Sequence, residues 1–442
     1  MLRTAAPPSP YPHSSLPRAA DPDRRRTSAS VVLRSVLEHG PVARSTIARL
    51  TGLSPASVTD HCARLTRRGL IRESAVPRRS GGVGRPHVPV DLDATRLVVG
   101  GVHVAVPYTT VALLDLRGRV LAERRLPHGT TEPSRVLARA ADGLTALLDR
   151  LSDSRTPDSR TPDARTPDAR TPDARTPASR TPDARVPGPR VLGVGFAAGG
   201  WVDREAGAVV EHPLLGWREV AVRDALAART GLPVHVDGHA RALVNAERLF
   251  GRARGSGSVL HLFVGNVVDS AFATHDEVHH GPRSQAGSIA HLPLAGGTEP
   301  CACGRSGCLQ AELSERTLCR RAYEAGVPGI RGADGADPMR LVEAAAAGRP
   351  AAVRLLLERA RMVGRAVSLL ADVLNPERVV VTEMGVVHRE DCLAALLAEV
   401  GGQRAATVAP TSFPESVLAV AGGSVALDVL YRDPLGASPE RN

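Results

Sequence analysis

The chain contains 442 residues, of which 43% are hydrophobic and six are cysteine, a composition typical of a globular protein with two or three domains. The sequence has no run of about 18 apolar residues and no apolar stretch near its N-terminus, so we expect neither a transmembrane helix nor a secretory leader. These features predict a cytoplasmic protein that has no membrane partner and keeps its cysteines reduced.

The net charge of +10 is concentrated at the N-terminal end of the chain. Residues 1–90 contain 15 arginines and 5 acidic residues, whereas positive and negative residues balance in the remainder. A basic segment attached to a neutral body indicates a polyanionic partner, although a solvated basic tail would have the same charge.

Three short helices are predicted after a disordered tail at residues 1–23, which is rich in Pro, Ser and Ala. Residues 28–39 have apolar side chains at helical spacing, and a second helical pattern ends at Gly52. The third helix follows Ser54, a natural N-cap, and Pro55 suits its first position.

The third predicted helix has one apolar face, formed by Val58, Cys62 and Leu65, and one polar face. Two short strands around an arginine- and glycine-rich tip follow it, so residues 24–91 read as a winged helix-turn-helix that places this helix in the major groove of double-stranded DNA. A small helical domain used for protein contacts is the alternative. The predicted DNA contacts are Ser54, Ser57, Thr59, Asp60 and Arg64 of the helix, and Arg78, Arg79 and Arg85 of the wing.

Residues 92–435 alternate strand-like runs with helical patterns, which predicts an α/β domain. Helices are expected over residues 218–231 and 351–375. Residues 152–190 contain the repeated unit RTPDA, whose prolines and balanced charges predict a disordered insertion, and residues 436–442 are predicted to form a tail.

Three cysteines lie within the stretch "CACGRSGC", at positions 301, 303 and 308. The reducing compartment disfavours a disulfide, and an iron–sulfur cluster normally requires four thiolates. Zinc accepts three cysteines and one histidine, and His291 is the best candidate for the fourth ligand. Inert buried thiols are the alternative.

The stretch "HLPLAGGTEPCACGRSGCLQAELS" closely resembles the zinc signature of the ROK family (repressors, open reading frames, kinases), which has the form G-H-x-C-x-C-G-x-x-G-C-x-E. With the winged helix, residues 28–435 resemble the family's transcriptional repressors of sugar metabolism. The resemblance implies an actin-like, ribonuclease-H-like fold of two lobes around a sugar cleft. It also implies a structural zinc ion bound by His291, Cys301, Cys303 and Cys308.

The kinases of this family carry phosphate-binding and catalytic motifs that this sequence lacks. His103 stands where the phosphate loop D-x-G-G-T has its aspartate, and "GNVVDSA" at residues 265–271 replaces the second glycine-rich turn. The N-D pair that contains the general base aligns with Asp237 and Gly238, and glycine accepts no proton. We therefore predict that the protein is not an enzyme.

The residues that bind sugar in the family are also changed, because its E-x-G-H motif reads Ser288-Ile289-Ala290-His291. Asp237, Ser288, His291 and Gln310 are the predicted effector-binding residues. The sequence thus predicts a regulator, a repressor, that binds a DNA operator as a homodimer or homotetramer and responds to a possible sugar effector. The alternatives are an active sugar kinase with a helix-turn-helix and a regulator that no longer binds a sugar.

Overall fold

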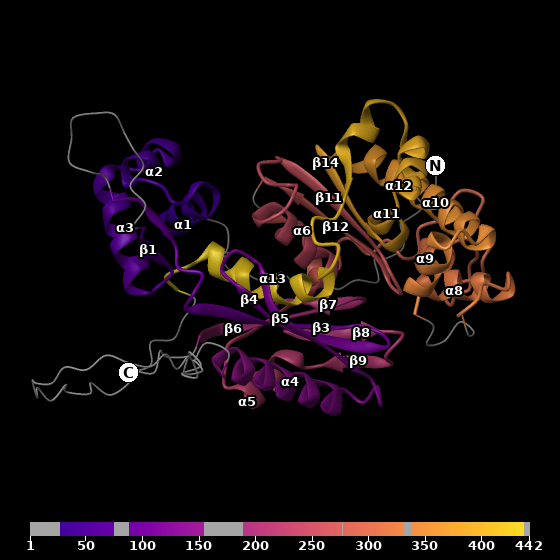
Figure 1. The fold of residues 1–442 in the computed structure, drawn as a ribbon, viewed down its shortest axis with the longest axis horizontal. Coiled ribbons are helices and arrows are strands. Elements are labelled where there is room, and N and C mark those ends of the chain that lie inside the picture. The colour runs from indigo at the N-terminus through magenta and orange to yellow at the C-terminus, as the bar shows by residue number, and fades with distance from the viewer. Residues whose placement is uncertain (1–26, 75–87, 154–188, 276, 331–336, 437–442) are drawn as a thin grey trace, which may run out of the picture.

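The computed structural model describes residues 27–74, 88–153, 189–275, 277–330 and 337–436, which form an N-terminal module and two lobes (Figure 1). The expected tail at residues 1–23, the tip of the wing, residues 154–188 of the predicted insertion and residues 437–442 lie outside this description. The predicted bounds of the insertion, residues 152–190, are wrong at both ends, because Ser152 and Asp153 belong to a helix and Arg190 begins a strand. No helix within the described ranges is long and apolar enough to span a membrane.

The N-terminal module is a helix-turn-helix followed by a pair of antiparallel strands. Thr27 caps the first helix by accepting a hydrogen bond from the amide of Ser30, and Ser54 caps the third by accepting one from the amide of Ser57. Gly52 ends the second helix with a left-handed φ of 70°. The predicted winged helix-turn-helix is therefore confirmed. Its elements are α1 (Ser28–His39), α2 (Arg44–Thr51), α3 (Pro55–Arg67), β1 (Ile71–Glu73) and β2 (Val90–Leu92).

The first lobe is built on a five-stranded sheet with the order β10-β6-β3-β4-β5. Two helices, α4 and α5, cover one face of this sheet, and α13 covers the other (Figure 1). A small three-stranded sheet is inserted between β6 and α5. The elements are β3 (Leu97–Val104), β4 (Tyr108–Asp115), β5 (Val120–Pro127), α4 (Pro133–Asp153), β6 (Arg190–Ala198), β7 (Trp201–Asp203), β8 (Ala208–His212), β9 (Trp217–Val220), α5 (Val222–Thr230), β10 (Val234–Gly238) and α13 (Val417–Arg432).

The helix expected over residues 218–231 is wrong at its start, because Arg218 to Val220 belong to strand β9. This strand pairs with β8, and the side chain of Trp217 is buried and donates a hydrogen bond to the carbonyl of Thr131 at 2.6 Å. Pairing with a distant strand thus overrides the helical pattern.

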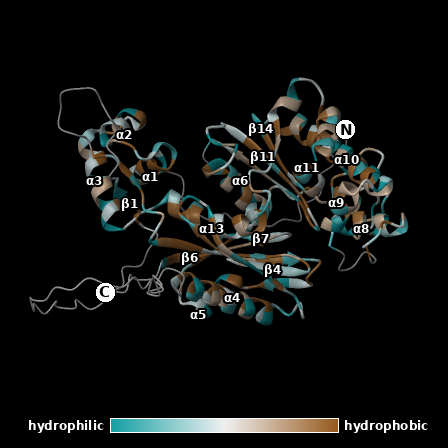
Figure 2. Ribbon diagram, viewed as in Figure 1, coloured by the Kyte–Doolittle hydropathy of each residue, from teal (hydrophilic) through white to brown (hydrophobic). Residues whose placement is uncertain are grey.

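The second lobe has a five-stranded sheet with the order β13-β12-β11-β14-β15, packed against a group of helices. Figure 2 shows hydrophobic residues in the interior strands of the two sheets, such as β6 and β11, and hydrophilic residues on the peripheral helix α8. The elements are β11 (Ser258–Val264), β12 (Val268–Thr274), β13 (Glu277–Val278), α7 (Leu309–Leu313), α8 (Glu315–Glu324), α9 (Met339–Ala346), α10 (Pro350–Leu374), β14 (Arg378–Glu383), α11 (Met384–His388), α12 (Glu390–Val400) and β15 (Val408–Pro410).

Two helices form the layer between the sheets: α6 (His239–Leu249) and α13. Buried residues of α6 pack on the second sheet and on α13, whereas α13 lies directly on β3 and β6. The fold is the predicted two-lobed actin-like α/β architecture, and the layer made by α6 and α13 joins its lobes.

The N-terminal module is attached to the first lobe through the C-terminal end of α13. The hydroxyl of Ser30 in α1 donates a hydrogen bond to the carbonyl of Tyr431 at 2.5 Å, and Arg68 donates to the carbonyl of Leu435 at 2.6 Å. The phenol of Tyr431 in turn donates to the carbonyl of Leu116 at 2.7 Å. Buried side chains of the module and of α13 form one continuous hydrophobic cluster, so the module is packed onto the body.

Candidate functional site

The predicted metal ligands come together in one cluster. The ligand atoms of His291, Cys301, Cys303 and Cys308 all lie within 4.8 Å of one another. The Nδ1 of His291 is 3.5 Å from the Sγ of Cys301, and the Sγ atoms of Cys303 and Cys308 are 3.7 Å apart. None of these cysteines forms a disulfide. The cluster could therefore hold a metal ion.

The chain turns sharply between these cysteines, and glycine makes the turn possible. Gly304 and Gly307 have left-handed φ angles of 85° and 72°. A Cβ atom on Gly307 would lie 2.5 Å from the carbonyl oxygen of Gly297, so the loop could not close with a larger residue there. Hydrogen bonds from Arg305, first from its main chain and then from its side chain, lower the pKa of Cys303 to about 6.

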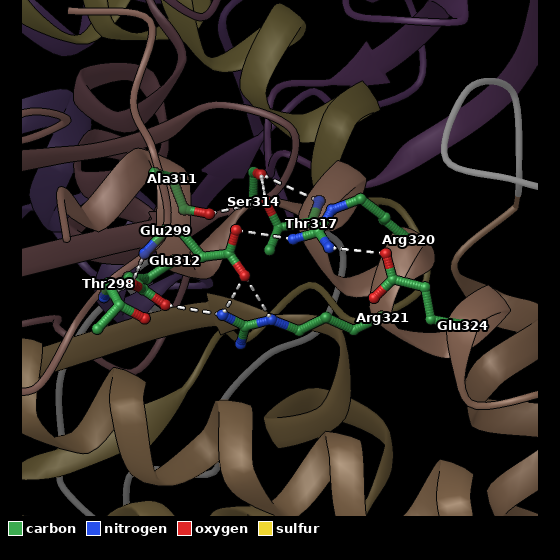
Figure 3. Close-up of polar contacts among 9 residues, drawn as sticks. All are labelled: Thr298, Glu299, Ala311, Glu312, Ser314, Thr317, Arg320, Arg321 and Glu324. Carbon is green, nitrogen blue, oxygen red and sulfur yellow. Dashed lines mark hydrogen bonds and ion pairs between the residues drawn. The ribbon is translucent and has the colours of Figure 1, made fainter. Parts of the chain in front are cut away.

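A network of acidic and arginine side chains braces the cysteine loop (Figure 3). The buried carboxylate of Glu312 accepts hydrogen bonds from the amides of Thr298 and Glu299, the two residues that lead into the cysteines. Arg321 donates to Glu312 and to Glu299, at 2.8 Å in each case, and Arg320 donates to Glu299 at 2.7 Å. The network thus fixes the loop to α7 and α8.

Sequence reasoning missed these bracing residues, since it considered only metal ligands and sugar-binding positions. Glu312 lies four residues after the last cysteine of the motif, in α7, and Arg321 lies nine residues further on, in the next helix, α8. The sequence does show an acidic residue and an arginine close to the metal motif, which could have indicated a bracing pair. Such pairs are, however, common on exposed helices.

The predicted DNA-contacting residues of α3 lie where the sequence placed them, opposite the buried face of Val58, Cys62 and Leu65. Thr59, Asp60 and Arg64 are exposed, Ser57 is half-buried, and Ser54 uses its side chain to cap the helix. Arg64 approaches Asp60 at 3.9 Å, which aligns both side chains along the exposed face. The predicted wing contacts Arg78, Arg79 and Arg85 lie outside the described residues.

The four predicted effector residues have different surroundings. The carboxylate of Asp237 is buried and accepts a hydrogen bond from Arg241 at 2.6 Å and one from the amide of Gly238 at 2.7 Å. Gln310 accepts a hydrogen bond from the amide of Val268 and donates one to the carbonyl of Asn266, so its amide holds the turn between β11 and β12.

Ser288 is exposed, and His291 belongs to the metal cluster. A role of the four residues in binding an effector stays a prediction.

A large cleft lies between the lobes, with a volume of about 640 Å³. Its walls include the turn after β3, the turn after β11, the start of α8 and the segment leading into α13. The side-chain amide of Asn266 donates a hydrogen bond to the carbonyl of Val106 at 2.9 Å, so the two turns touch each other across the cleft. None of the four predicted effector residues lines this cleft.

Comparison with known proteins assigns the chain to a family. Residues 183–422 match the ROK family. A transcriptional regulator of Mycobacterium tuberculosis is 32% identical over 429 residues, which cover 93% of this chain and 87% of the relative. A xylose repressor of Caldicellulosiruptor bescii is 24% identical over 358 residues, which cover 79% and 81%. The chain therefore belongs to the ROK family, as its cysteine motif indicated, and it is a regulator of the repressor type.

Solved structures show the same fold. A ROK family transcriptional regulator, a homologue of the Mlc protein of E. coli, superimposes with a TM-score of 0.68 and 20% identity, over 92% of this chain and 96% of its own. A ROK glucokinase of Streptomyces griseus superimposes with a TM-score of 0.58 and 22% identity, over 74% and 98%. The kinase matches a smaller share of the chain than the regulator does.

The bracing network generates a prediction about stability. Replacement of Arg321 by Met should lower the free energy of unfolding by about 2–3 kcal/mol, because it leaves the buried carboxylate of Glu312 without its cation. Replacement of Arg320, whose partners are more exposed, should cost no more than about 1 kcal/mol. Urea unfolding of the two variants, each loaded with metal, measures both changes in the free energy of unfolding. Equal losses in the two variants would contradict the bracing role of Arg321.

Proposed function

We propose that this ROK-family regulator represses transcription by binding an operator in DNA through the exposed face of α3, and that its kinase-like body has no catalytic activity. The observation that carries this proposal is the polar, uncovered face of α3 in a basic module. In this proposal residues 24–91 bind DNA in the cytoplasm, and residues 92–435 bind an effector and assemble the protein.

A symmetric assembly supports useful DNA affinity, because one small module makes few contacts with the double helix. We therefore propose a homodimer or homotetramer that binds an inverted repeat. A partner subunit doubles the number of base and phosphate contacts without any change in the module.

The DNA contacts can be tested with two arginine variants that should fail in different ways. Arg64→Ala should weaken operator binding by about 1–3 kcal/mol and reduce discrimination against scrambled DNA, if Arg64 contacts a base edge. Arg85→Ala should weaken binding to both DNAs evenly and make the affinity less dependent on salt, if it neutralises a phosphate. Gel-shift titrations at two salt concentrations distinguish the patterns. Intact operator binding after deletion of residues 24–91 would refute the assignment.

The metal that suits the cysteine cluster is zinc, in a structural role. Three thiolates and one imidazole form a complete tetrahedral set, and zinc–sulfur bonds of about 2.3 Å place sulfur atoms about 3.8 Å apart. The 3.7 Å between Cys303 and Cys308 fits this geometry. Such an ion would tie the loop to the start of α7 and complete the bracing by Glu312.

A metal assay tests this assignment. Cys303→Ser should remove most of the zinc from the purified protein and lower its unfolding midpoint, because metal binding is coupled to folding. Cys319→Ala is the matched control, since it removes a buried thiol outside the cluster and should keep the metal. Elemental analysis measures the zinc content of each variant, and urea unfolding measures its midpoint. A fully stable Cys303→Ser protein without metal would disprove a structural zinc ion.

The absence of kinase activity is proposed on three features of the two-lobed body. His103 and Pro107 replace parts of the phosphate loop, and the side chain of Asn266 is hydrogen-bonded to the carbonyl of Val106 in the same segment. The pKa of Asp237 is lowered: burial is the largest single influence and raises it, but the charges of Arg241, His280 and Arg204, together with the hydrogen bond from Arg241, outweigh burial. A carboxylate held in this way is a poor proton acceptor.

No phosphorylation of glucose, xylose or other common sugars should therefore be detected with ATP in a coupled assay. Turnover that disappears in an Asp237→Asn variant would establish the alternative, an active sugar kinase. The relatives named xylose repressors favour a sugar-related effector, but the changes at Ser288 and Gln310 weaken the case for free hexoses.

A further inference from the structure

A second cavity lies where the N-terminal module meets the body, and we call it the junction pocket. Its volume is about 410 Å³. Its walls come from the end of α1, the turn between β4 and β5, the end of α6 with the loop that follows, and residues 412–416, which lead into α13. The junction pocket and the interlobe cleft have only residues 414–416 in common, so they are separate cavities on two sides of this segment.

The lining of the junction pocket is positively charged. It contains three arginines, Arg117, Arg119 and Arg254, and one acidic residue, Glu415. The side chains of Arg119 and Arg254 are exposed, and within the described part of the chain they pair with no carboxylate. An anion that enters the pocket therefore meets two guanidinium groups that are not already occupied by an acidic side chain.

The turn between β4 and β5 holds two of these arginines in a fixed position. The buried carboxylate of Asp115 accepts hydrogen bonds from the amide of Arg117 at 2.8 Å and from the amide of Arg119 at 2.9 Å. Gly118 between them has a left-handed φ of 74°, and a Cβ atom there would lie 2.6 Å from the ring of Phe250. The turn therefore packs flat on Phe250, and its main chain needs no ordering when a ligand binds.

Glu247 of α6 holds a second wall of the pocket in place. Its carboxylate is fully buried and accepts hydrogen bonds from the hydroxyl of Thr411 at 2.8 Å, from the amide of Ser412 at 2.7 Å and from the amide of Arg252 at 3.1 Å. This carboxylate thus joins the segment before α13 to the loop that carries Arg254. With both walls fixed by buried carboxylates, the junction pocket is preformed, as is usual for ligand sites.

Apolar side chains form much of the remaining lining. They include Leu37, Val120, Leu249, Phe250 and Phe413, and the two aromatic rings are half-buried. Aromatic rings offer a large contact area to the flat body of an aromatic ligand. A pocket of this volume that combines apolar walls with unpaired cations suits a small organic anion.

The junction pocket spans the contact between the N-terminal module and the body. Leu37 belongs to α1 of the module, and Arg117 of the first lobe pairs with Asp91 of β2 at 2.5 Å. Phe250 packs edge-on against Tyr431, with ring centroids 6.0 Å apart, and Tyr431 is the residue through which α13 holds α1. A ligand in the pocket therefore contacts both sides of this joint.

We propose that the junction pocket binds a small aromatic carboxylate. The carboxylate group pairs with the guanidinium groups of Arg119 and Arg254, whose planar arrangement of donors matches its two oxygens, and the aromatic body packs against Phe413. A carboxylate suits the pocket better than a phosphate dianion, because the lining also contains Glu415 and apolar side chains that would desolvate a second negative charge. The proposal goes beyond the proposed repressor function and does not depend on it.

Two coumarin probes that differ only at the carboxyl group test the proposal on the full-length protein. 7-Diethylaminocoumarin-3-carboxylic acid is anionic at neutral pH, whereas its 3-carboxamide is uncharged. In fluorescence titrations the acid should bind about tenfold more tightly than the amide, or better, because only the acid can pair with the arginines. Equal binding of the two probes, or no measurable binding of the acid, would overturn the proposal.

Arginine variants locate the probe in the junction pocket. Arg119→Gln and Arg254→Gln should each weaken binding of the acid by about fivefold or more, because each removes one cation from the site. Arg252→Gln is the matched control, since Arg252 is exposed and lies two residues from Arg254 but does not line the pocket. All three side chains are exposed, so the variants should fold. Unchanged affinity in both lining variants, or an equal loss in the control, would overturn the proposal.

Competition tests the need for an aromatic body. The anion 2-naphthoate should displace the bound coumarin acid, whereas acetate at the same concentration should not, because acetate has no ring to pack against Phe413. Equal displacement by the two anions would show that the arginines attract any anion, and it would overturn the proposal.

Gel shifts with the same variants test whether these arginines serve DNA instead. Arg119→Gln and Arg254→Gln should leave the affinity for DNA unchanged. Weaker DNA binding together with unchanged binding of the coumarin acid would assign Arg119 and Arg254 to the phosphate backbone of DNA and refute the carboxylate site.

Discussion

The close packing of helix α13 on the first sheet is the constraint on which the rest of the structure depends. A Cβ atom on Gly195 would lie 2.2 Å from the carbonyl oxygen of Gly422, and one on Gly101 would lie 2.5 Å from the amide nitrogen of Gly423. Only glycine on both surfaces lets helix and strands approach this closely. The helix is buried along most of its length, so it cannot shift without moving β3 and β6. Sixteen residues span about 24 Å, so α13 connects the cleft at one end with the N-terminal helix-turn-helix module at the other.

The cysteine loop has a comparable role in the second lobe, where it fixes an irregular segment that has little regular hydrogen bonding of its own. Short bridges pair Pro293 with Cys308 and Pro300 with Ser306, and the carboxylate of Glu312 satisfies two further amides. The loop is thus held by tight turns and by hydrogen bonds to side chains. Its cysteines also form a site suited to a metal ion. Its position matters because Gln310, which follows the last cysteine, holds the turn at the edge of the cleft.

The cleft between the lobes is lined by turns and side chains from both of them. Asn266 joins the turn after β11 to the turn after β3, and the imidazoles of His103 and His239, which line the cleft, stack with ring centroids 5.6 Å apart. Arg359 of α10 is fully buried in the second lobe, where it pairs with Glu383 at 3.0 Å and donates a hydrogen bond to the carbonyl of Leu313. This buried ion pair ties α10 to the end of β14 and keeps the guanidinium group away from the cleft surface.

The sequence by itself determined the features that depend on neighbouring residues. Ser54 and Pro55 start α3, Gly52 ends α2, and the spacing of the cysteines indicates a cluster that could hold a metal ion, because caps, turns and ligand spacing are local properties. The family followed from the same cysteine motif.

Only the tertiary structure decided which polar side chains remain available. Asn266 and Val106 are 160 residues apart, so no local pattern could reveal that they meet. The amide of Gln310 is occupied by the turn between β11 and β12, and His103 and His239 stack although 136 residues separate them. Strand β9 likewise forms where the sequence predicted a helix, because it pairs with β8. Such contacts depend on how the lobes fold against each other, and the energy of a buried polar group depends on those distant partners rather than on its neighbours in the chain.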